Sequence, residues 1–163
     1  MLAMFGMVAG CAESKDKREY AVPSALCGVS VKPELVAPFL PGGKGLAVKE
    51  DRPVPTIKLC RVDVGKKWAL QANQQWWAED VSIATVASAN PQLGSTEDSS
   101  DSTFFYSGTG AVVRVKGCSN PKHSGQILYT SLSVRDTDLA DVPAMKKLAT
   151  AYTKAVKNSD ACS

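Results

Sequence analysis

The chain has 163 residues, of which 44% are hydrophobic and 21% are charged, an ordinary composition for one globular domain. Its formal net charge is +3, and no run of five or more like charges occurs. We therefore expect no nucleic-acid partner, because proteins that bind nucleic acids through charge gather Lys and Arg densely. No stretch of 18 consecutive apolar residues is present, so the sequence predicts no transmembrane helix, and any membrane association must come through an anchor.

Residues 1–10 carry no charge and are typical of the apolar core of an export signal with its small-residue end, and Cys11 follows them directly. The tetrapeptide Val8-Ala9-Gly10-Cys11 resembles the lipobox of bacterial lipoproteins. In those proteins the signal is cut before the cysteine, and the thiol then carries a diacylglycerol. The resemblance implies that Cys11 is lipidated and anchors the protein to the membrane. No Lys or Arg precedes the apolar run, so we expect residues 1–10 to be a partial signal; the alternative is an apolar strand with an incidental cysteine.

The rest of the chain divides into two parts by composition. Residues 11–21 begin at the lipobox cysteine and continue as a charged run, which is typical of a tether between a lipid and a folded domain. Residues 22–163 hold the remaining hydrophobic segments, and we expect one disulfide-stabilised domain there.

Five cysteines are many for a cytosolic chain of this length and usual for an exported one. Without Cys11 an even number remains: Cys27, Cys60, Cys118 and Cys162. Zinc sites need close ligand pairs or histidine partners, but the spacings here are long and the chain has one histidine. We therefore expect two disulfides, no metal and no cofactor.

Two hairpins are predicted from alternating apolar residues. Residues 57–64 and 68–72 alternate on either side of a glycine-containing turn, which indicates a first hairpin. Residues 111–117 and 127–134 alternate in the same way and indicate a second. The sheet is therefore expected to be antiparallel.

A C-terminal amphipathic helix is predicted to begin at Pro143, a position where the missing N–H costs nothing. Apolar residues recur at helical spacing on one face, while lysines and threonines occupy the other, which we interpret as a solvated surface. The strand that ends near residue 117, the strand that runs back, and the returning helix bring Cys118 and Cys162 to the same end of the sheet. By elimination, Cys27 is expected to pair with Cys60.

Three shorter segments complete the predicted fold. Residues 22–31 suggest a short helical turn, and residues 32–40 a second short helix opened by Pro33. Residues 82–89 fit either a helix or a strand, and the Asn90-Pro91 step that follows favours a short helix between the hairpins. The predicted fold class is α+β, with an antiparallel sheet of two hairpins, a C-terminal amphipathic helix and short N-terminal helical segments.

Candidates for chemistry are few. The acidic segment 92–102 contains Glu97, Asp98 and Asp101, but their spacing does not match a Ca²⁺-binding loop, so we expect a surface loop. His123 lies in a turn-forming sequence and would serve an extracytoplasmic hydrolase only if a serine or aspartate reached it in space. A hydrolase using His123 is therefore the alternative to a non-enzymatic role.

Adjacent aromatic residues are the most distinctive binding feature. Trp76 and Trp77 point to opposite faces if their segment is extended, and Phe104-Phe105-Tyr106 forms a second aromatic run. One interpretation is a platform, with Trp76 or Trp77 in contact with a small molecule, a glycan or a protein partner. The other is that one ring fills the core and the second lies under a loop.

The lipobox, the polar tether, the segment from Val22 to Gly28 and the Leu59-Cys60-Arg61-Val62 strand together resemble small actinobacterial cell-envelope lipoproteins of uncharacterised function. The resemblance implies an outward-facing domain held by lipid at the extracytoplasmic face of the cell membrane. It supplies no activity. We expect a binding or envelope-associated role without catalysis.

Overall fold

The computed structural model describes residues 17–94, 97–98 and 102–163. The predicted signal, the predicted lipidation site Cys11 and the first part of the tether lie outside the described residues, as does Asp101 of the acidic segment. In the part of the chain that is described, no helix is long and apolar enough to cross a membrane.

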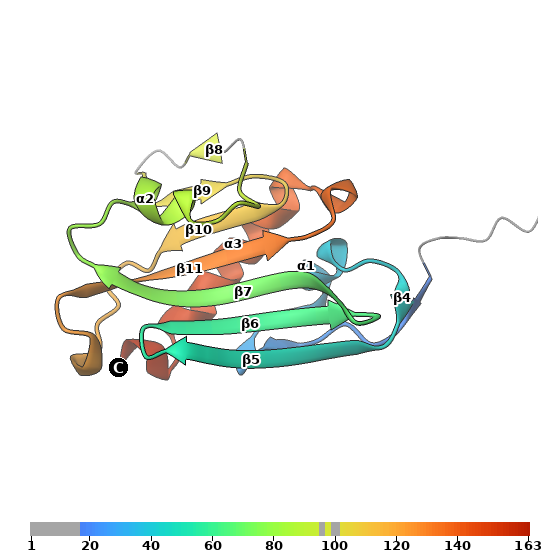
Figure 1. The fold of residues 1–163 in the computed structure, drawn as a ribbon, viewed down its shortest axis with the longest axis horizontal. Helices are drawn as coiled ribbons and strands as arrows, with labels where there is room; N and C mark the ends of the chain where they lie inside the picture. The colour runs from blue at the N-terminus through green and yellow to red at the C-terminus, as the bar shows by residue number, and fades with distance from the viewer. Residues whose placement is uncertain (1–16, 95–96, 99–101) are drawn as a thin grey trace, which may run out of the picture.

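A seven-stranded sheet forms the centre of the molecule, and every neighbouring pair of its strands is antiparallel (Figure 1). From one edge to the other the order is β5 (Leu46–Val54), β6 (Ile57–Val64), β7 (Lys67–Ala78), β11 (Gln126–Val134), β10 (Gly110–Arg114), β9 (Phe104–Tyr106) and β8 (Glu97–Asp98). Both predicted hairpins are present, as β6–β7 and β10–β11, and they meet where β7 pairs with β11. The predicted α+β class is confirmed.

The turn between β6 and β7 is formed by two residues with left-handed backbone, Gly65 at φ 55° and Lys66 at φ 70°. Turns with positive φ at both central residues match the twist of the strands that they join. Strand β7 then continues to Ala78, well beyond the end of the predicted strand, so it carries both Trp76 and Trp77.

Helix α3 (Val142–Lys157) covers one face of the sheet (Figure 1). Asp141 caps its start by accepting a 2.8 Å hydrogen bond from the Ala144 amide, and Pro143 occupies the first turn as predicted. Its apolar stripe is buried and consists of Met145, Leu148, Ala149, Tyr152 and Val156. This stripe packs on apolar side chains of the central strands and forms the main core.

Short N-terminal elements extend the same layer. Helix α1 (Pro33–Val36) and the 3-10 turn η1 (Ala37–Phe39) account for the second predicted N-terminal helix. The parallel pair β1 (Arg18–Glu19) and β4 (Gly43–Lys44) joins the start of the described chain to the segment that leads into β5.

The predicted helical turn over residues 22–31 is wrong. These residues form a small antiparallel hairpin, β2 (Ala25–Leu26) and β3 (Val29–Ser30). Cys27 and Gly28 make its turn with φ values of 49° and 83°, which a helix does not allow. The hairpin buries Leu26 and Val29 against the core, so tertiary packing decides the conformation of this short apolar segment.

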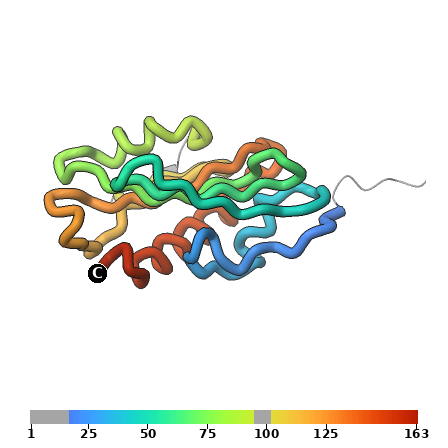
Figure 2. Tube along the Cα trace, turned by 60° about the horizontal axis from the view of Figure 1, so that its bottom comes forward, coloured from blue at the N-terminus to red at the C-terminus, as the bar shows by residue number. Residues whose placement is uncertain are grey.

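The second face of the sheet is only partly covered. Helix α2 (Ile83–Ser88), the short helix expected between the hairpins, is capped by Ser82, whose hydroxyl accepts from the Thr85 amide. It lies over the β9–β10 side of the sheet. A smaller cluster of buried residues fills the space beneath it: Val86, Leu93, Val112 and Tyr129. Figure 2 shows the resulting layers, with α2 on one side of the sheet and α3 with the N-terminal elements on the other.

Two disulfides join the layers: Cys27 is bonded to Cys60, and Cys118 to Cys162. Both predicted pairs are present: Cys118–Cys162 was expected from the strand directions and Cys27–Cys60 by elimination. The first ties the β2–β3 turn to β6. The second ties the segment after β10 to the C-terminal 3-10 turn η4 (Asp160–Cys162), which lies beside the loop containing η2 (Pro121–His123) in Figure 1.

Candidate functional site at Trp76 and His123

Trp76 lies near the end of β7 on the face covered by α3, opposite Leu128 of β11. Its indole stacks on the imidazole of His123, with ring centroids 4.4 Å apart and ring planes 7° from parallel. Trp76 was selected from the sequence as a candidate ligand contact and His123 as a candidate catalytic residue. The β7–β11 pairing brings them together, because the η2 segment leads directly into β11.

His123 is held by its own turn as well as by the stack. Asn120 caps η2 by accepting from the Lys122 amide at 3.0 Å, and the Nδ1 atom of His123 lies 3.0 Å from Oε1 of Gln126. In the part of the chain that the structure describes, neither a serine nor an aspartate is hydrogen-bonded to the His123 ring. The ring is thus arranged as a contact surface, and the geometry gives no support to activation of a hydroxyl.

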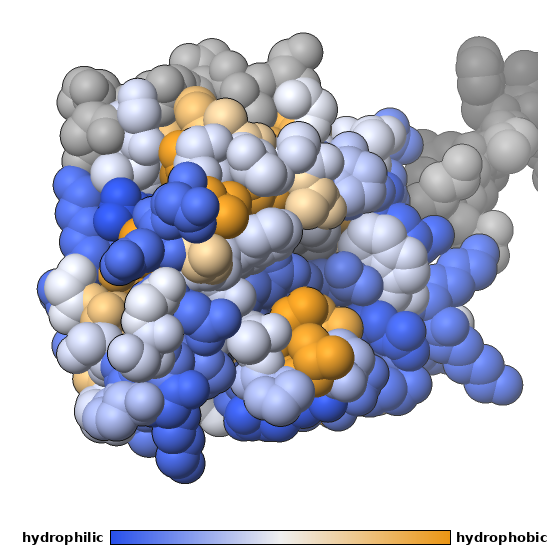
Figure 3. All heavy atoms as spheres, turned by 60° about the vertical axis from the view of Figure 1, so that its left-hand side comes forward, coloured by the Kyte–Doolittle hydropathy of each residue, from blue (hydrophilic) through white to orange (hydrophobic). Residues whose placement is uncertain are grey.

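The stacked pair lines a hollow of about 220 Å³. We call this the Trp76–His123 hollow. Strands β5, β6 and β7, the η2 loop and the C-terminal turn supply its walls through Arg52, Pro55, Thr56, Lys58, Gln74, Trp76, Asn120, Lys122, His123, Ser159, Asp160 and Ala161, with Gly28 and Val29 from the N-terminal hairpin. Figure 3 brings this end of the molecule forward and shows mostly polar side chains around smaller hydrophobic patches.

Both disulfides hold the walls of the Trp76–His123 hollow. Cys27 directly precedes Gly28, and Cys162 directly follows Ala161. The side-chain amide of Asn120 donates to the Ala161 carbonyl at 3.1 Å, which links the η2 loop to the C-terminal turn. Ser159 also lines the hollow, but its hydroxyl donates to the Val156 carbonyl at 2.6 Å and accepts from the Ala161 amide. The walls are therefore fixed independently of any ligand.

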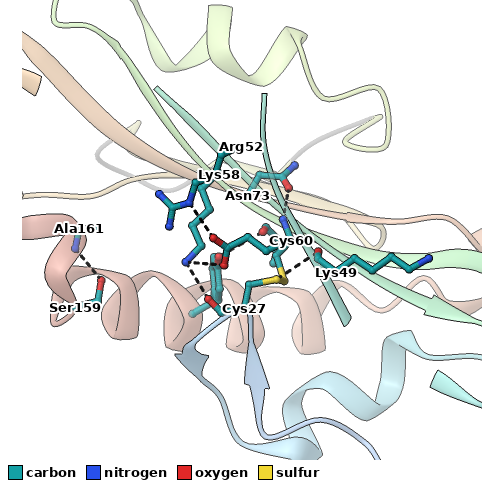
Figure 4. A network of polar contacts seen from close by, with 11 residues as sticks. Cys27, Lys49, Arg52, Lys58, Cys60, Asn73, Ser159 and Ala161 are labelled. Carbon is teal, nitrogen blue, oxygen red and sulfur yellow. Dashed lines mark hydrogen bonds and ion pairs between the residues drawn. A yellow bond between two sulfur atoms is a disulfide. The ribbon is translucent and has the colours of Figure 1, made fainter. Parts of the chain in front are cut away.

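Three cations face the Trp76–His123 hollow, and two of them are positioned by one carboxylate. Lys58 Nζ donates to the carbonyl of Cys27 at 2.9 Å and lies 3.4 Å from Glu50 Oε2 (Figure 4). Arg52 Nε donates to Glu50 Oε1 at 2.8 Å. The hydrogen bond from Arg52 is the main reason that the pKa of Glu50 lies below its ordinary value, with Lys58 adding to the effect. The third cation, Lys122, is exposed.

Trp77 takes no part in this site. It lies on the opposite face of β7, where its indole N–H donates to Oε1 of Gln75 at 3.1 Å and its ring packs on the cluster beneath α2. Because the two half-buried rings lie on opposite faces of the sheet, they do not form one shared platform. Phe104 and Tyr106 of β9 pack on the main core instead, with ring centroids 4.8 Å apart and ring planes tilted by 47°.

The cationic part of the hollow was not identified from the sequence. Arg52 and Lys58 lie on neighbouring strands, and β5 itself was not predicted. Two acidic residues of the 92–102 segment form the short strand β8. Among the described residues, no three His, Cys, Asp or Glu side chains come together in a group that could hold a metal ion.

Models of protein families, curated proteins and solved structures were each compared with this chain, and none matches it.

Proposed function

We propose that this protein is a lipid-anchored bacterial envelope protein that faces outward and binds a ligand without catalysing its conversion. The ligand of the Trp76–His123 hollow is a small molecule that carries a carboxylate or phosphate group. The observation that carries the binding role is the stacked Trp76–His123 pair in the wall of a preformed polar hollow with three cations.

The location is supported by the lipobox resemblance at Cys11 and by the two disulfides in the folded domain. Disulfides form and persist in oxidising compartments, which include the outer side of the bacterial cell membrane. A diacylglycerol with a further acyl chain holds a protein at a membrane more firmly than the marginal binding of one chain. The folded domain then needs no membrane-spanning element of its own.

The binding role is supported by the chemistry of the hollow. Lys58, Arg52 and Lys122 carry three positive charges, and Glu50 and Asp160 carry two negative ones. Amide groups of Gln74 and Asn120 and the hydroxyl of Thr56 add neutral hydrogen-bonding groups. A few polar groups placed around a partly aromatic hollow are typical of small-molecule sites.

The anchor is tested by expressing the full chain and its Cys11→Ser variant in a bacterium that processes lipoproteins. We expect the native chain in the detergent-extracted membrane fraction, with the mass of a diacylglycerol on Cys11, and the variant outside that fraction. A native chain with an unmodified Cys11 thiol would contradict the anchor and leave the binding site untouched.

The hollow is tested by NMR titration of the purified protein with citrate and with inorganic phosphate as probes. We expect shifts of the Trp76 indole N–H and the His123 ring, and a Kd at least tenfold weaker in Lys122→Gln. Lys67→Gln is the matched control, because Lys67 is an exposed lysine at the far end of β7. Equal titrations of all three proteins, or no shift with either probe, would contradict the proposed site.

A further inference from the structure

The uncovered half of the sheet carries a second polar surface on the side opposite the Trp76–His123 hollow. In Figure 1, strands β5, β6 and β7 have no element in front of them, because α2 lies over the other half. Three hollows follow one another here, of about 480, 290 and 90 Å³. The first two share Lys49 and Arg61, and the last two share Gln71 and Asn73. We call this continuous surface the open-face groove.

Strand register places the polar side chains of the open-face groove in two rows. Residues that are directly opposite each other in antiparallel strands have side chains on the same face. The first row crosses β5, β6, β7 and β11 through Lys49, Arg61, Gln71 and Ser133. The second crosses the same strands through Asp51, Leu59, Asn73 and Ser131. With strands about 4.8 Å apart, each row is about 14 Å long.

Several polar side chains in the groove make few or no hydrogen bonds within the described part of the chain. Asn73 and Ser131 are each 8% exposed. Across the described residues, no hydrogen bond involves the Ser131 hydroxyl or the amide nitrogen of Asn73, whose oxygen accepts a long 3.4 Å bond from the Cys60 amide. The Gln71 amide is likewise unpaired within the described part of the chain, and it lines the same two hollows as Asn73. The floor of the groove therefore offers donors and acceptors to a ligand with many hydrogen-bonding groups.

The far wall of the groove is also polar but already ordered. Asn90, after α2, donates to the Leu132 carbonyl at 3.0 Å and accepts from the Ser133 hydroxyl at 2.9 Å. These bonds fix the edge of the groove beneath α2. Ser131 and Asn73 are not part of them and line the groove directly.

The other end of the groove is basic. Lys44, Lys49, Arg61 and Lys66 line the largest hollow together with the single carboxylate of Asp63. Asp63 holds two of these cations: Lys49 Nζ is 2.7 Å from its Oδ2, and Arg61 Nε is 2.9 Å from its Oδ1. The Asp63 side chain is 5% exposed, while those of Lys49 and Arg61 are 58% and 48% exposed. The buried carboxylate thus orients two cations that remain accessible to a ligand.

From these observations we propose that the open-face groove binds an acidic oligosaccharide, a polyhydroxylated chain that carries carboxylate or phosphate groups. The acidic group pairs with Arg61, Lys49 and Lys66, where charge-assisted hydrogen bonds are strongest. The sugar hydroxyls, which both donate and accept, bind the amides of Gln71 and Asn73 and the hydroxyl of Ser131. This site is separate from the Trp76–His123 hollow, and its ligand does not depend on the proposed anchor.

An acidic peptide is the competing ligand, and the groove fits it less well. Peptide grooves gain specificity from pockets for alternate side chains. The floor here presents mainly amides and hydroxyls, with Asp51 and Leu59 beside them and Val86 at the edge under α2. The rows also run across the strands, so a ligand that follows them does not extend the sheet as a peptide strand would.

The proposal is tested on the folded protein by calorimetry and by NMR of the side-chain amides, with trigalacturonate as the probe. We expect shifts of the Gln71 and Asn73 amide groups, a Kd that rises with salt, and at least tenfold weaker binding by Arg61→Gln. Ser131→Ala, which changes no charge, is expected to weaken binding about fivefold, in proportion to one lost hydrogen bond. Lys147→Gln is the control, because Lys147 is an exposed lysine on α3, away from the groove.

Maltotriose and triglutamate complete the experiment as a neutral sugar and an acidic peptide. The proposal holds if trigalacturonate binds at least tenfold more tightly than both. It is overturned if triglutamate binds as tightly, if the neutral sugar binds equally well, or if no probe binds at millimolar concentration. Shifts confined to Trp76 and His123 also overturn it, because they place the ligand in the other hollow. Circular dichroism of each variant verifies that a lost signal is not a loss of fold.

Discussion

The carboxylate of Asp63 is almost inaccessible to solvent, yet it accepts a 2.7 Å hydrogen bond from Lys49, a lysine whose side chain is largely exposed. The hydrogen bond from Lys49 is the main cause that lowers the pKa of Asp63 below its ordinary value of 3.8, with the Arg61 guanidinium adding to it. Burial opposes this effect but does not reverse it. The Asp63 side chain therefore links strand β6 to strand β5 and holds Lys49 and Arg61 at the basic end of the open-face groove.

Asp63→Asn is expected to lower the free energy of unfolding at pH 7 by about 1 kcal/mol, because both partners are half-exposed and recover solvation. The pKa of Asp63 is lower in the folded state than in the unfolded state. Its contribution is therefore present above about pH 4 and is lost as the pH falls through the folded-state pKa. Urea unfolding at pH 7, 5 and 3 measures this. A native-to-variant difference that grows toward pH 3 would contradict the assignment.

The two disulfides are expected to stabilise the domain by similar amounts. They close loops with sequence separations of 33 and 44 residues, and the loop-entropy relation gives about 4 kcal/mol for each. Cys27→Ala/Cys60→Ala and Cys118→Ala/Cys162→Ala are compared by denaturant unfolding. The second pair should also broaden the NMR signals of His123, because the C-terminal turn that supports the η2 loop loses its link. If removing either disulfide left the midpoint of denaturant unfolding unchanged, the predicted stabilisation of about 4 kcal/mol per disulfide would be wrong.

Much of the fold could be predicted because its central strands alternate cleanly. Val62 and Leu70 are buried while Arg61 and Gln71 face the open side, so the sequence itself shows the β6–β7 hairpin. Strand β5 gives no such signal. It is an edge strand whose residues after Leu46 are all exposed, and Pro53 lies within it. Backbone pairing with β6 rather than burial holds it, and hydrophobic patterning cannot detect that.

The sites were less predictable, because both depend on register between distant strands. Trp76 was recognisable as an unusual aromatic residue, but its contact with His123 requires the pairing of β7 with β11. Gln71 and Ser133 are far apart in sequence and adjacent in the sheet for the same reason. The wrong prediction at residues 22–31 has a different origin. The left-handed backbone at Cys27 accompanies the hairpin and the disulfide, which local sequence does not reveal. Gly28 was the one residue in this segment that could have indicated a turn.

Tyr152 is expected to be the last of the four tyrosines to ionise. It is 1% exposed, and burial raises the pKa of its phenol to about 12. Because this pKa is above the unfolded value of about 10, its contribution to stability is complete below pH 10 and is lost as the pH rises toward 12. Titration followed at 295 nm should show a final step that Tyr152→Phe removes. A variant that retains the whole late step would show that another tyrosine is the buried one.

His123→Ala is expected to expose Trp76 and to lower the free energy of unfolding by about 1 kcal/mol, the usual value of an aromatic pair beyond its buried area. Uncovering the indole should shift the tryptophan emission to longer wavelength and increase quenching by acrylamide. Lys122→Ala is the matched control, because Lys122 directly precedes His123 in η2 but is not part of the Trp76–His123 stack. In a Trp76→Phe background the same His123 change should alter neither emission nor quenching, because Trp68 and Trp77 do not form the stacked pair. If the effect persists there, His123 acts on the fold rather than on Trp76, and the preformed wall of the hollow must have another origin.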